Sequence, residues 1–235
     1  MRPCVHLHLW PGFVFLGLLL SVLQQGYFLR ASAALKFLYV FGYTASAFNC
    51  LCSAFTHTFQ IVNARWFTTL WRLDQVSILG ASAGHMCLDV FIVCVALLRR
   101  SEAFFAVVGI LLLATAVVAH RVMTVPGAGL YWSAVYLASF ALTLPLSIYV
   151  FGFGQSLEAT GVAVEQLRTV TMFSGLCSLS IYIAGAFFVG KAPEVFLPQL
   201  RILDYFHSHA IFHVFTLTAS VCAIATTPYL PAIDA

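Results

Sequence analysis

Long apolar runs separated by short polar breaks set the pattern of this chain. About 20 apolar residues are enough to cross a bilayer as a helix, and the sequence contains seven runs of about that length. They cover residues 10–29, 37–57, 74–98, 103–122, 129–151, 169–190 and 207–230. None of them alternates apolar and polar positions as a barrel strand does, and each is about twice the length of such a strand. The pattern predicts an all-α bundle of seven transmembrane helices.

The breaks between the runs are short, as at residues 99–102 and 125–127. Such connections leave no room for a second domain, so we expect residues 1–235 to form a single seven-helix membrane domain. One alternative stays open at the amino end. Arg2, the apolar stretch that begins at Trp10 and the small residues around Ala31 are also the parts of a secretory signal peptide. Cleavage there would leave six spans.

Composition supports the membrane assignment, because 62% of the residues are hydrophobic and only 8% are charged, whereas soluble domains carry about 25% charged residues. We expect a multi-pass protein of the plasma membrane or an endomembrane. With the amino terminus placed in the cytosol, the 11 basic residues divide six to five between the two sides, so the positive-inside rule gives no orientation. The net charge of +3 comes without a long basic cluster, which argues against nucleic acid as a partner.

The seven cysteines do not form a recognisable framework, and six of them fall within the apolar runs. Cys50 and Cys52 are two residues apart, a spacing that sends two helical side chains to different faces and so excludes a zinc pair. We expect the cysteines to act as small apolar side chains.

His209 and His213 stand one helical turn apart in the last apolar run. Residues i and i+4 share a helix face, and ionisable groups inside a membrane are candidates for a functional site. In an alternating bundle, the end of the second run at His57 and the start of the third at Asp74 lie on the same membrane face as the start of the seventh. At about 1.5 Å per residue, His213 lies roughly 9 Å along the axis from His207, so the site is predicted just inside that face.

Three neutral imidazoles around one ion leave a fourth position open, which is the arrangement of a catalytic zinc site. Zinc in such a site lowers the pKa of a bound water to about 7. The pattern therefore predicts zinc held by His57, His209 and His213. Asp74 is the predicted general base, which takes a proton from the water and passes it to the leaving group. Ser53 precedes His57 by one turn, where its hydroxyl can orient a ligand, a water or an oxyanion.

These segments together resemble the signature regions of the progestin and adipoQ receptor family. The matching features are Ser53-x3-His57 in the second run, Asp74 opening the third, and His209-x3-His213 in the seventh. The resemblance covers nearly all seven runs, and that family is grouped with haemolysin III proteins and alkaline ceramidases. It implies a seven-helix fold with zinc on the three histidines, a cytosolic amino terminus and an outer carboxyl terminus. For members similar to the adiponectin receptors it also implies slow hydrolysis of the ceramide amide bond.

The amino-terminal segment departs from the family pattern. Members of the receptor branch carry Glu-x2-Asn-x3-His before the first span, whereas residues 1–8 offer His6 and His8 without the acidic residue or the Asn. Phe206 stands where the family usually has a Gly before the seventh-run histidines. We expect that the amino end is either truncated or diverged. This sequence has no long amino-terminal domain before the first run, so we do not expect a protein hormone as the partner. The expected partner is a ceramide-like membrane lipid or a steroid.

Three functions fit these residues. The first is a zinc-dependent lipid amide hydrolase of the ceramidase type. The second is a lipid, steroid or hormone receptor in which the zinc is structural and no hydrolysis occurs. The third is a haem-carrying electron-transfer bundle, because paired histidines on membrane helices also bind haem.

The remaining histidines have simpler interpretations. His85 and Asp89 are four residues apart in the third run and are expected to satisfy each other. His120 ends the fourth run beside Arg121, which is typical of an interfacial residue. His207 is expected to cap the last helix or to contact the ligand histidines.

Overall fold

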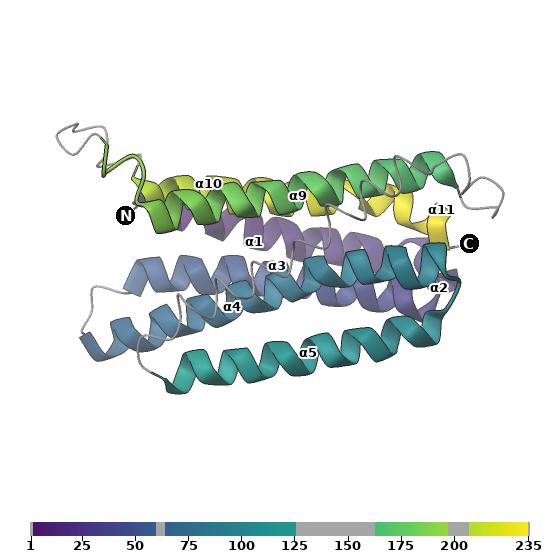
Figure 1. Ribbon diagram of the computed structural model, residues 1–235, viewed down its shortest axis with the longest axis horizontal. Coiled ribbons are helices and arrows are strands. Elements are labelled where there is room, and N and C mark those ends of the chain that lie inside the picture. Colours follow the sequence, from purple (N-terminus) through teal and green to yellow (C-terminus); the bar gives the residue numbers. More distant parts are fainter. Residues whose placement is uncertain (1, 60–63, 126–162, 197–206, 235) are drawn as a thin grey trace.

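Figure 1 shows a computed structural model of the chain, which describes residues 2–59, 64–125, 163–196 and 207–234. All regular structure in these residues is helical, so the prediction of an all-α membrane bundle is confirmed. The elements are α1 (Arg2–Leu23), α2 (Gly26–Arg30), α3 (Ala33–Phe59), α4 (Ala64–Phe91) with a π-helical turn η1 (Ile92–Leu97), α5 (Ser101–Thr124), α9 (Val164–Gly190), α10 (Ser208–Ala225), the 3₁₀ turn η4 (Thr227–Tyr229) and α11 (Leu230–Asp234).

Five stretches of helix among the described residues are long and apolar enough to cross a membrane. They are Ala33–Phe59, Trp66–Leu97, Ser101–Thr124, Val164–Gly190 and Ser208–Asp234, and the shorter apolar stretch His8–Leu23 precedes them. The predicted first span, 10–29, is broken because α1 ends at Leu23 and α2 begins at Gly26. The predicted span 129–151 lies outside the described residues. The length and apolar composition of the five described stretches make this an integral membrane protein.

The third predicted span begins earlier than its apolar window. Asp74 was expected at its opening, but α4 begins at Ala64, ten residues before it, so Asp74 lies about 15 Å inside the helix. Arg72 Nη1 donates to the backbone carbonyl of Met123, near the end of α5, at 2.7 Å. This contact gives the charged side chain a partner, so α4 continues through a segment that hydropathy alone assigns to a break.

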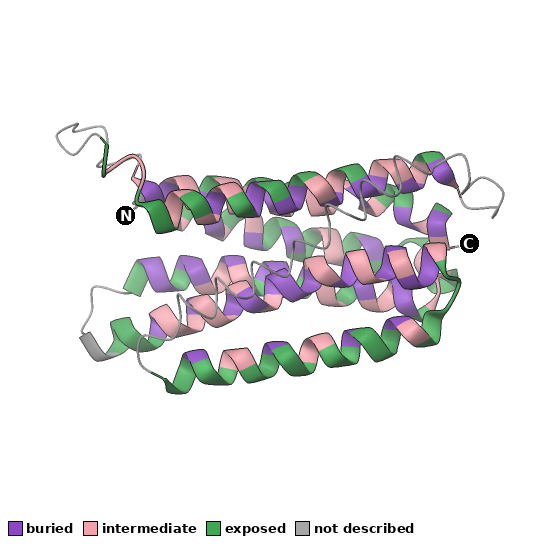
Figure 2. Cartoon of the chain, viewed as in Figure 1, coloured by how far each residue is buried: buried purple, intermediate pink, exposed green. Residues whose placement is uncertain are grey.

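Helices next to each other in the chain pack side by side: α1 against α3, α3 against α4, α4 against α5, and α9 against α10. Small residues permit two of these approaches. A Cβ added at Gly84 would lie 3.3 Å from the Cα of Gly42, and one at Gly12 would lie 2.8 Å from Leu51 Cδ2. Close backbone approach through small residues is the usual way that membrane helices associate. In Figure 2, α5 is largely exposed, and its exposed residues include Ile110 and Leu113, as expected for a helix facing lipid.

The two ends of the bundle carry different polar contacts. At one end, α1 and α10 begin where α3 ends, at the left in Figure 1. At the other end, the Asp234 carboxylate accepts hydrogen bonds from the backbone amide and hydroxyl of Ser32, and the hydroxyls of Tyr43 and Thr227 are 2.6 Å apart. These contacts tie the end of α11 and the turn before it to α3. The topology therefore gathers the first turns of α1 and α10 around the last turn of α3.

Candidate metal centre

Three imidazoles from two helices converge on one point. His57 lies in the last turn of α3, while His209 and His213 lie on one face of the first two turns of α10. The Nε2 atom of His213 is 3.0 Å from that of His57 and 2.9 Å from that of His209, and the remaining pair is 3.3 Å apart. The structure thus brings together the three residues that were predicted from the sequence as metal ligands. We call His57, His209 and His213 the histidine triad.

The spacing of the triad suits one tetrahedral ion. With zinc–nitrogen bonds of about 2.0–2.1 Å, neighbouring ligand nitrogens in a tetrahedral site lie about 3.3 Å apart. The observed distances of 2.9, 3.0 and 3.3 Å would place the nitrogens at angles of about 90–110° around such an ion. The donor set therefore fits a metal and leaves a further coordination position.

Hydrogen bonding within the triad cannot satisfy all three Nε2 atoms. Each neutral imidazole nitrogen either carries a hydrogen or presents a lone pair. Among three such atoms, at least two must both carry a hydrogen or both present a lone pair. The contact between those two atoms cannot be a hydrogen bond. A cation at the centre relieves this conflict, because all three nitrogens then present lone pairs to it.

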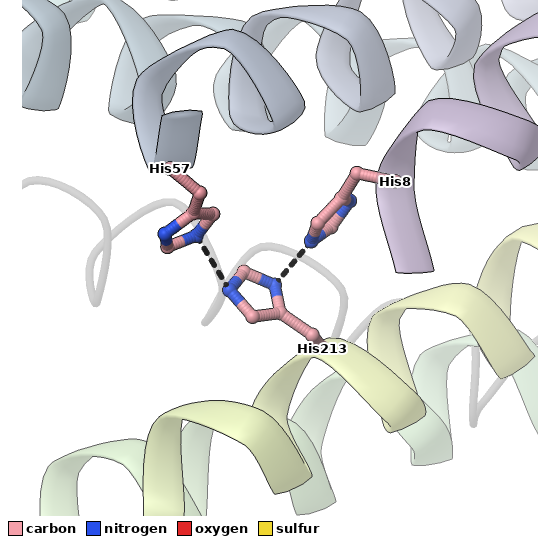
Figure 3. Close-up of side chains that lie close together, drawn as sticks. All are labelled: His8, His57 and His213. Atoms are coloured by element: carbon pink, nitrogen blue, oxygen red, sulfur yellow. Dashed lines mark hydrogen bonds between the residues drawn. The ribbon is translucent and has the colours of Figure 1, made fainter. Parts of the chain in front are cut away.

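His8 is a fourth member of the site that the sequence analysis did not propose as a ligand. Its side chain is 5% exposed, and its Nε2 is 2.6 Å from Nδ1 of His213. Figure 3 shows His8 from α1, His57 from α3 and His213 from α10 with their rings directed toward one another. One nitrogen from each of these buried rings lies within 4.8 Å of the others, which is close enough to hold a metal ion.

The predicted catalytic residues line the same cavity as His8, His209 and His213. Ser53, Asp74, His8, His209 and His213 all contribute to a cavity with about 1160 Å³ of empty volume, including its open mouth. Asp74 is 4% exposed and Ser53 is 2% exposed. Ser53 Oγ and Asp74 Oδ1 are buried and make no hydrogen bond of ordinary geometry within the described part of the chain. Polar atoms buried in this way normally face a partner such as water, an ion or a ligand; the catalytic roles of both residues stay predictions.

Aromatic rings shield the triad on the side of His209. The ring centroids of Trp71 and His209 are 5.9 Å apart in a stacked arrangement, and Phe188 lies 5.6 Å from the same imidazole. Both aromatic residues also line the cavity. The histidines therefore lie in surroundings that are mostly apolar, where a bound cation interacts strongly with its ligands.

The first turn of α10 is held by two caps, which fixes the start of the helix that carries His209. Nδ1 of His207 accepts a hydrogen bond from the backbone amide of Ala210 at 3.2 Å, so the prediction that His207 caps this helix is confirmed. The Glu194 carboxylate accepts from both the amide and the hydroxyl of Ser208, each at 2.8 Å. Burial by itself raises the pKa of Glu194, but the backbone hydrogen bonds and the Ser208 hydroxyl together lower it.

Other polar residues from the sequence analysis have partners outside the triad, although His85 lines the same cavity. His85 Nδ1 contacts Cys177 Sγ at 3.5 Å, and Asp89 Oδ1 accepts a hydrogen bond from Ser174 at 2.6 Å. Both contacts reach α9, where His85 and Asp89 meet different residues, while His85 Nε2 is buried without a hydrogen bond among the described residues. His120 is exposed near the end of α5, as an interfacial residue would be. The six cysteines whose side chains are described are all free.

The chain is similar in sequence to a known protein family over most of its length. The family model for haemolysin-III related proteins matches residues 2–224. The matched range contains His8, the histidine triad and the two predicted catalytic residues. No curated protein matches the chain.

Proposed function

Because the chain belongs to the haemolysin-III related family, we propose that it is a membrane metal hydrolase that holds zinc on the histidine triad and cleaves the amide bond of a ceramide-like lipid. The observation that carries the proposal is the approach of three Nε2 atoms to within 3.3 Å of one another. A donor set of three imidazoles without a thiolate is typical of catalytic zinc.

The side chains around the triad provide the parts of an amide hydrolysis. Zinc bound there would lower the pKa of a water molecule and polarise the substrate carbonyl. Asp74 accepts one proton as the water oxygen attacks the carbonyl carbon, and it delivers that proton to the nitrogen as the carbon–nitrogen bond breaks. Ser53 Oγ, which lies close to Asp74, orients the attacking water or the carbonyl oxygen. The products are a free amine and a carboxylic acid.

The cavity supports a lipid as the substrate. Its walls beyond the triad are mostly apolar and include Ile78, Leu79, Ile181 and Phe188. Pockets of this kind bind through apolar walls, while a few polar groups fix the orientation of the ligand. An amide head group would lie against Asp74 and the histidines, and its chains would lie along the apolar walls.

The arrangement of the helix ends bears on the orientation of the protein in the membrane. We place the amino terminus in the cytosol, and the protein in the plasma membrane or an endomembrane. Since α1 begins at the end of the bundle where α3 ends and α10 begins, the triad would then lie near the cytosolic face. A protease-sensitive tag added before Met1 should be cleaved only after the membrane is made permeable to protease.

The geometry is less suited to haem. Haem binds two axial histidines on opposite faces of the macrocycle, whereas all three triad nitrogens are within 3.3 Å of one another. A porphyrin cannot lie between atoms at that distance. Purified protein should therefore show no Soret band.

The deciding experiment compares the wild-type protein with Asp74→Asn, both purified in detergent as the full chain. Metal analysis should find one zinc in each protein, because Asp74 is not a ligand in this proposal. Ceramide hydrolysis, followed by release of the free amine, should fall about 10²–10⁴-fold in the variant, which is the usual contribution of a general base.

Two outcomes would contradict the proposed hydrolase. Wild-type protein without a bound metal would remove the site. Zinc-loaded wild-type protein without hydrolysis of any ceramide, together with ligand binding that Asp74→Asn leaves unchanged, would instead favour a lipid or steroid receptor with structural zinc.

A further inference from the structure

His8 approaches His213 from behind the triad. Its Nε2 lies 2.6 Å from Nδ1 of His213, while the opposite ring nitrogen of His213 is the one that meets His57 and His209. The ring planes of His8 and His213 are nearly perpendicular, at 85°. We infer that His8 is a positioning residue, which accepts a hydrogen bond from Nδ1–H of His213 and so directs the Nε2 lone pair of His213 at the metal. This inference rests on the proposed zinc site.

The distance argues against a site in which His8 Nε2 and Nδ1 of His213 bind the same ion. Two nitrogens 2.6 Å apart, each at about 2.0–2.1 Å from zinc, would subtend only about 80° at the metal, far below the tetrahedral angle. The same separation is just short of the distances of about 2.7–3.2 Å that are usual for hydrogen bonds donated by N–H groups. His209 meets the geometric requirement better, since its Nε2 is 2.9 Å and 3.3 Å from the other two triad nitrogens.

The protonation states then follow from one another. A neutral imidazole carries a single hydrogen, so a His213 that presents its Nε2 lone pair to a metal must carry its hydrogen on Nδ1. That hydrogen needs an acceptor, because His213 is only 2% exposed and a buried polar hydrogen without an acceptor is costly. His8 Nε2 provides it. Metal-bound histidines usually donate their second ring hydrogen in this way, most often to a carboxylate or a carbonyl, and loss of the acceptor typically costs 10–100-fold in metal affinity.

This contact also links the first helix to the metal. His8 lies in the first two turns of α1, whereas the triad is carried by α3 and α10. A helix that contributes no ligand is thereby held against the site, so we expect its packing to become tighter when the metal binds.

The test measures zinc affinity by competition with a chelator in four proteins: wild type, His8→Gln, His8→Phe and His6→Gln. His8→Phe keeps a ring but removes the acceptor, so its dissociation constant should rise about 10–100-fold. His8→Gln restores an acceptor through its side-chain oxygen and should recover most of that loss. His6→Gln is the matched control, since His6 is two residues away on the same helix and exposed, and its affinity should equal that of wild type.

Cobalt substitution gives a readout that does not depend on activity. The visible absorption of bound Co²⁺ reports the ligands, and it should keep its intensity in His8→Gln while it disappears in His209→Ala. The opposite pattern, with cobalt bound in His209→Ala but lost in both His8 variants, would make His8 a ligand and overturn the inference. An unchanged zinc affinity in His8→Phe would also overturn it but would leave the proposed hydrolase intact. Only wild-type protein without metal would remove both.

Discussion

Two groups of polar residues lie inside this helix bundle, and their geometry differs in a way that separates a site from a structural contact. In the first, the three Nε2 atoms of the histidine triad point at a common centre. In the second, which we call the His85 group, His85, Asp89, Ser174 and Cys177 join α4 to α9 in separate contacts. His85 lies eleven residues beyond Asp74 on α4, about 16 Å along the helix axis.

The two groups differ in how far their donors and acceptors can be matched by hydrogen bonds within the group. The Ser174 hydroxyl donates to the Asp89 carboxylate, so donor and acceptor are matched in that pair. In the same group, His85 Nε2 is buried without a hydrogen bond among the described residues, and His85 lines the cavity of the triad, but its free nitrogen does not converge with others on one point. The triad nitrogens cannot be matched among themselves, because three atoms of two possible states always include two alike. Ionisable residues inside a membrane are functional candidates by default, and convergence on one point is the feature that makes the triad the candidate metal site.

The sharpest test of this difference exchanges one histidine in each group for alanine. His57→Ala removes one of three ligands, so its zinc affinity should fall by more than the roughly 100-fold that loss of an outer hydrogen-bond partner can cause. His85→Ala should bind zinc with the affinity of wild type. Both proteins should be compared by chelator competition at one detergent concentration. Equal losses in the two variants would contradict the distinction, since they would point to a general effect on folding.

A smaller effect is expected at Ser53. Its buried hydroxyl lines the cavity without an ordinary hydrogen bond in the described chain, so Ser53→Ala should retain zinc while its hydrolysis rate falls about 10-fold, as expected for loss of one hydrogen bond in the transition state. Ser46→Ala is the matched control. Ser46 lies on the same helix and is similarly buried, at 6% exposed, but it lines a different cavity. The rate of that control should equal the wild-type rate, and a loss in both variants would count against a role for Ser53.

The sequence predicted the fold and the approach of His57, His209 and His213 to one another, because both depend on simple repeats. Apolar runs of helical length predicted the all-α bundle. Helical periodicity placed His209 beside His213, and alternating topology brought His57 to the same end, where their nitrogens meet. These inferences need only the direction of each helix, which hydropathy and chain order supply.

The parts that the sequence did not predict depend on contacts between helices. The predicted first span begins at Trp10, so His8 lies outside it. The helix nevertheless extends back to Arg2, and His8 is buried against His213. Likewise, Arg72 marked a break in hydropathy, but its partner is a backbone carbonyl on α5. Neither partner lies near its residue in the chain, so no local pattern could reveal it.

The smallest effect should come from the His85 group, where the comparison can be sharpened by stability alone. Ser174→Ala removes the hydrogen bond to Asp89, and buried hydrogen bonds between membrane helices contribute about 0.6 kcal/mol on average, with a maximum near 1.7 kcal/mol. The free energy of unfolding should fall by about 0.6 kcal/mol and by no more than about 1.7 kcal/mol, and the zinc affinity should not change. Ser180→Ala is the control on the same helix, because the Ser180 hydroxyl donates only to the carbonyl of Leu176 one turn earlier.

Unfolding in mixed micelles with increasing denaturing detergent measures both variants against wild type. A lower stability for Ser174→Ala than for Ser180→Ala, with equal zinc affinity, fits a contact that holds α9 against α4 and takes no part in the metal centre. If Ser174→Ala instead weakened zinc binding, the two polar groups would be coupled through α4. The hydrogen bond between Ser174 and Asp89 would then belong to the metal site. The convergence of the triad nitrogens on one point would no longer be enough to tell which residues make up that site.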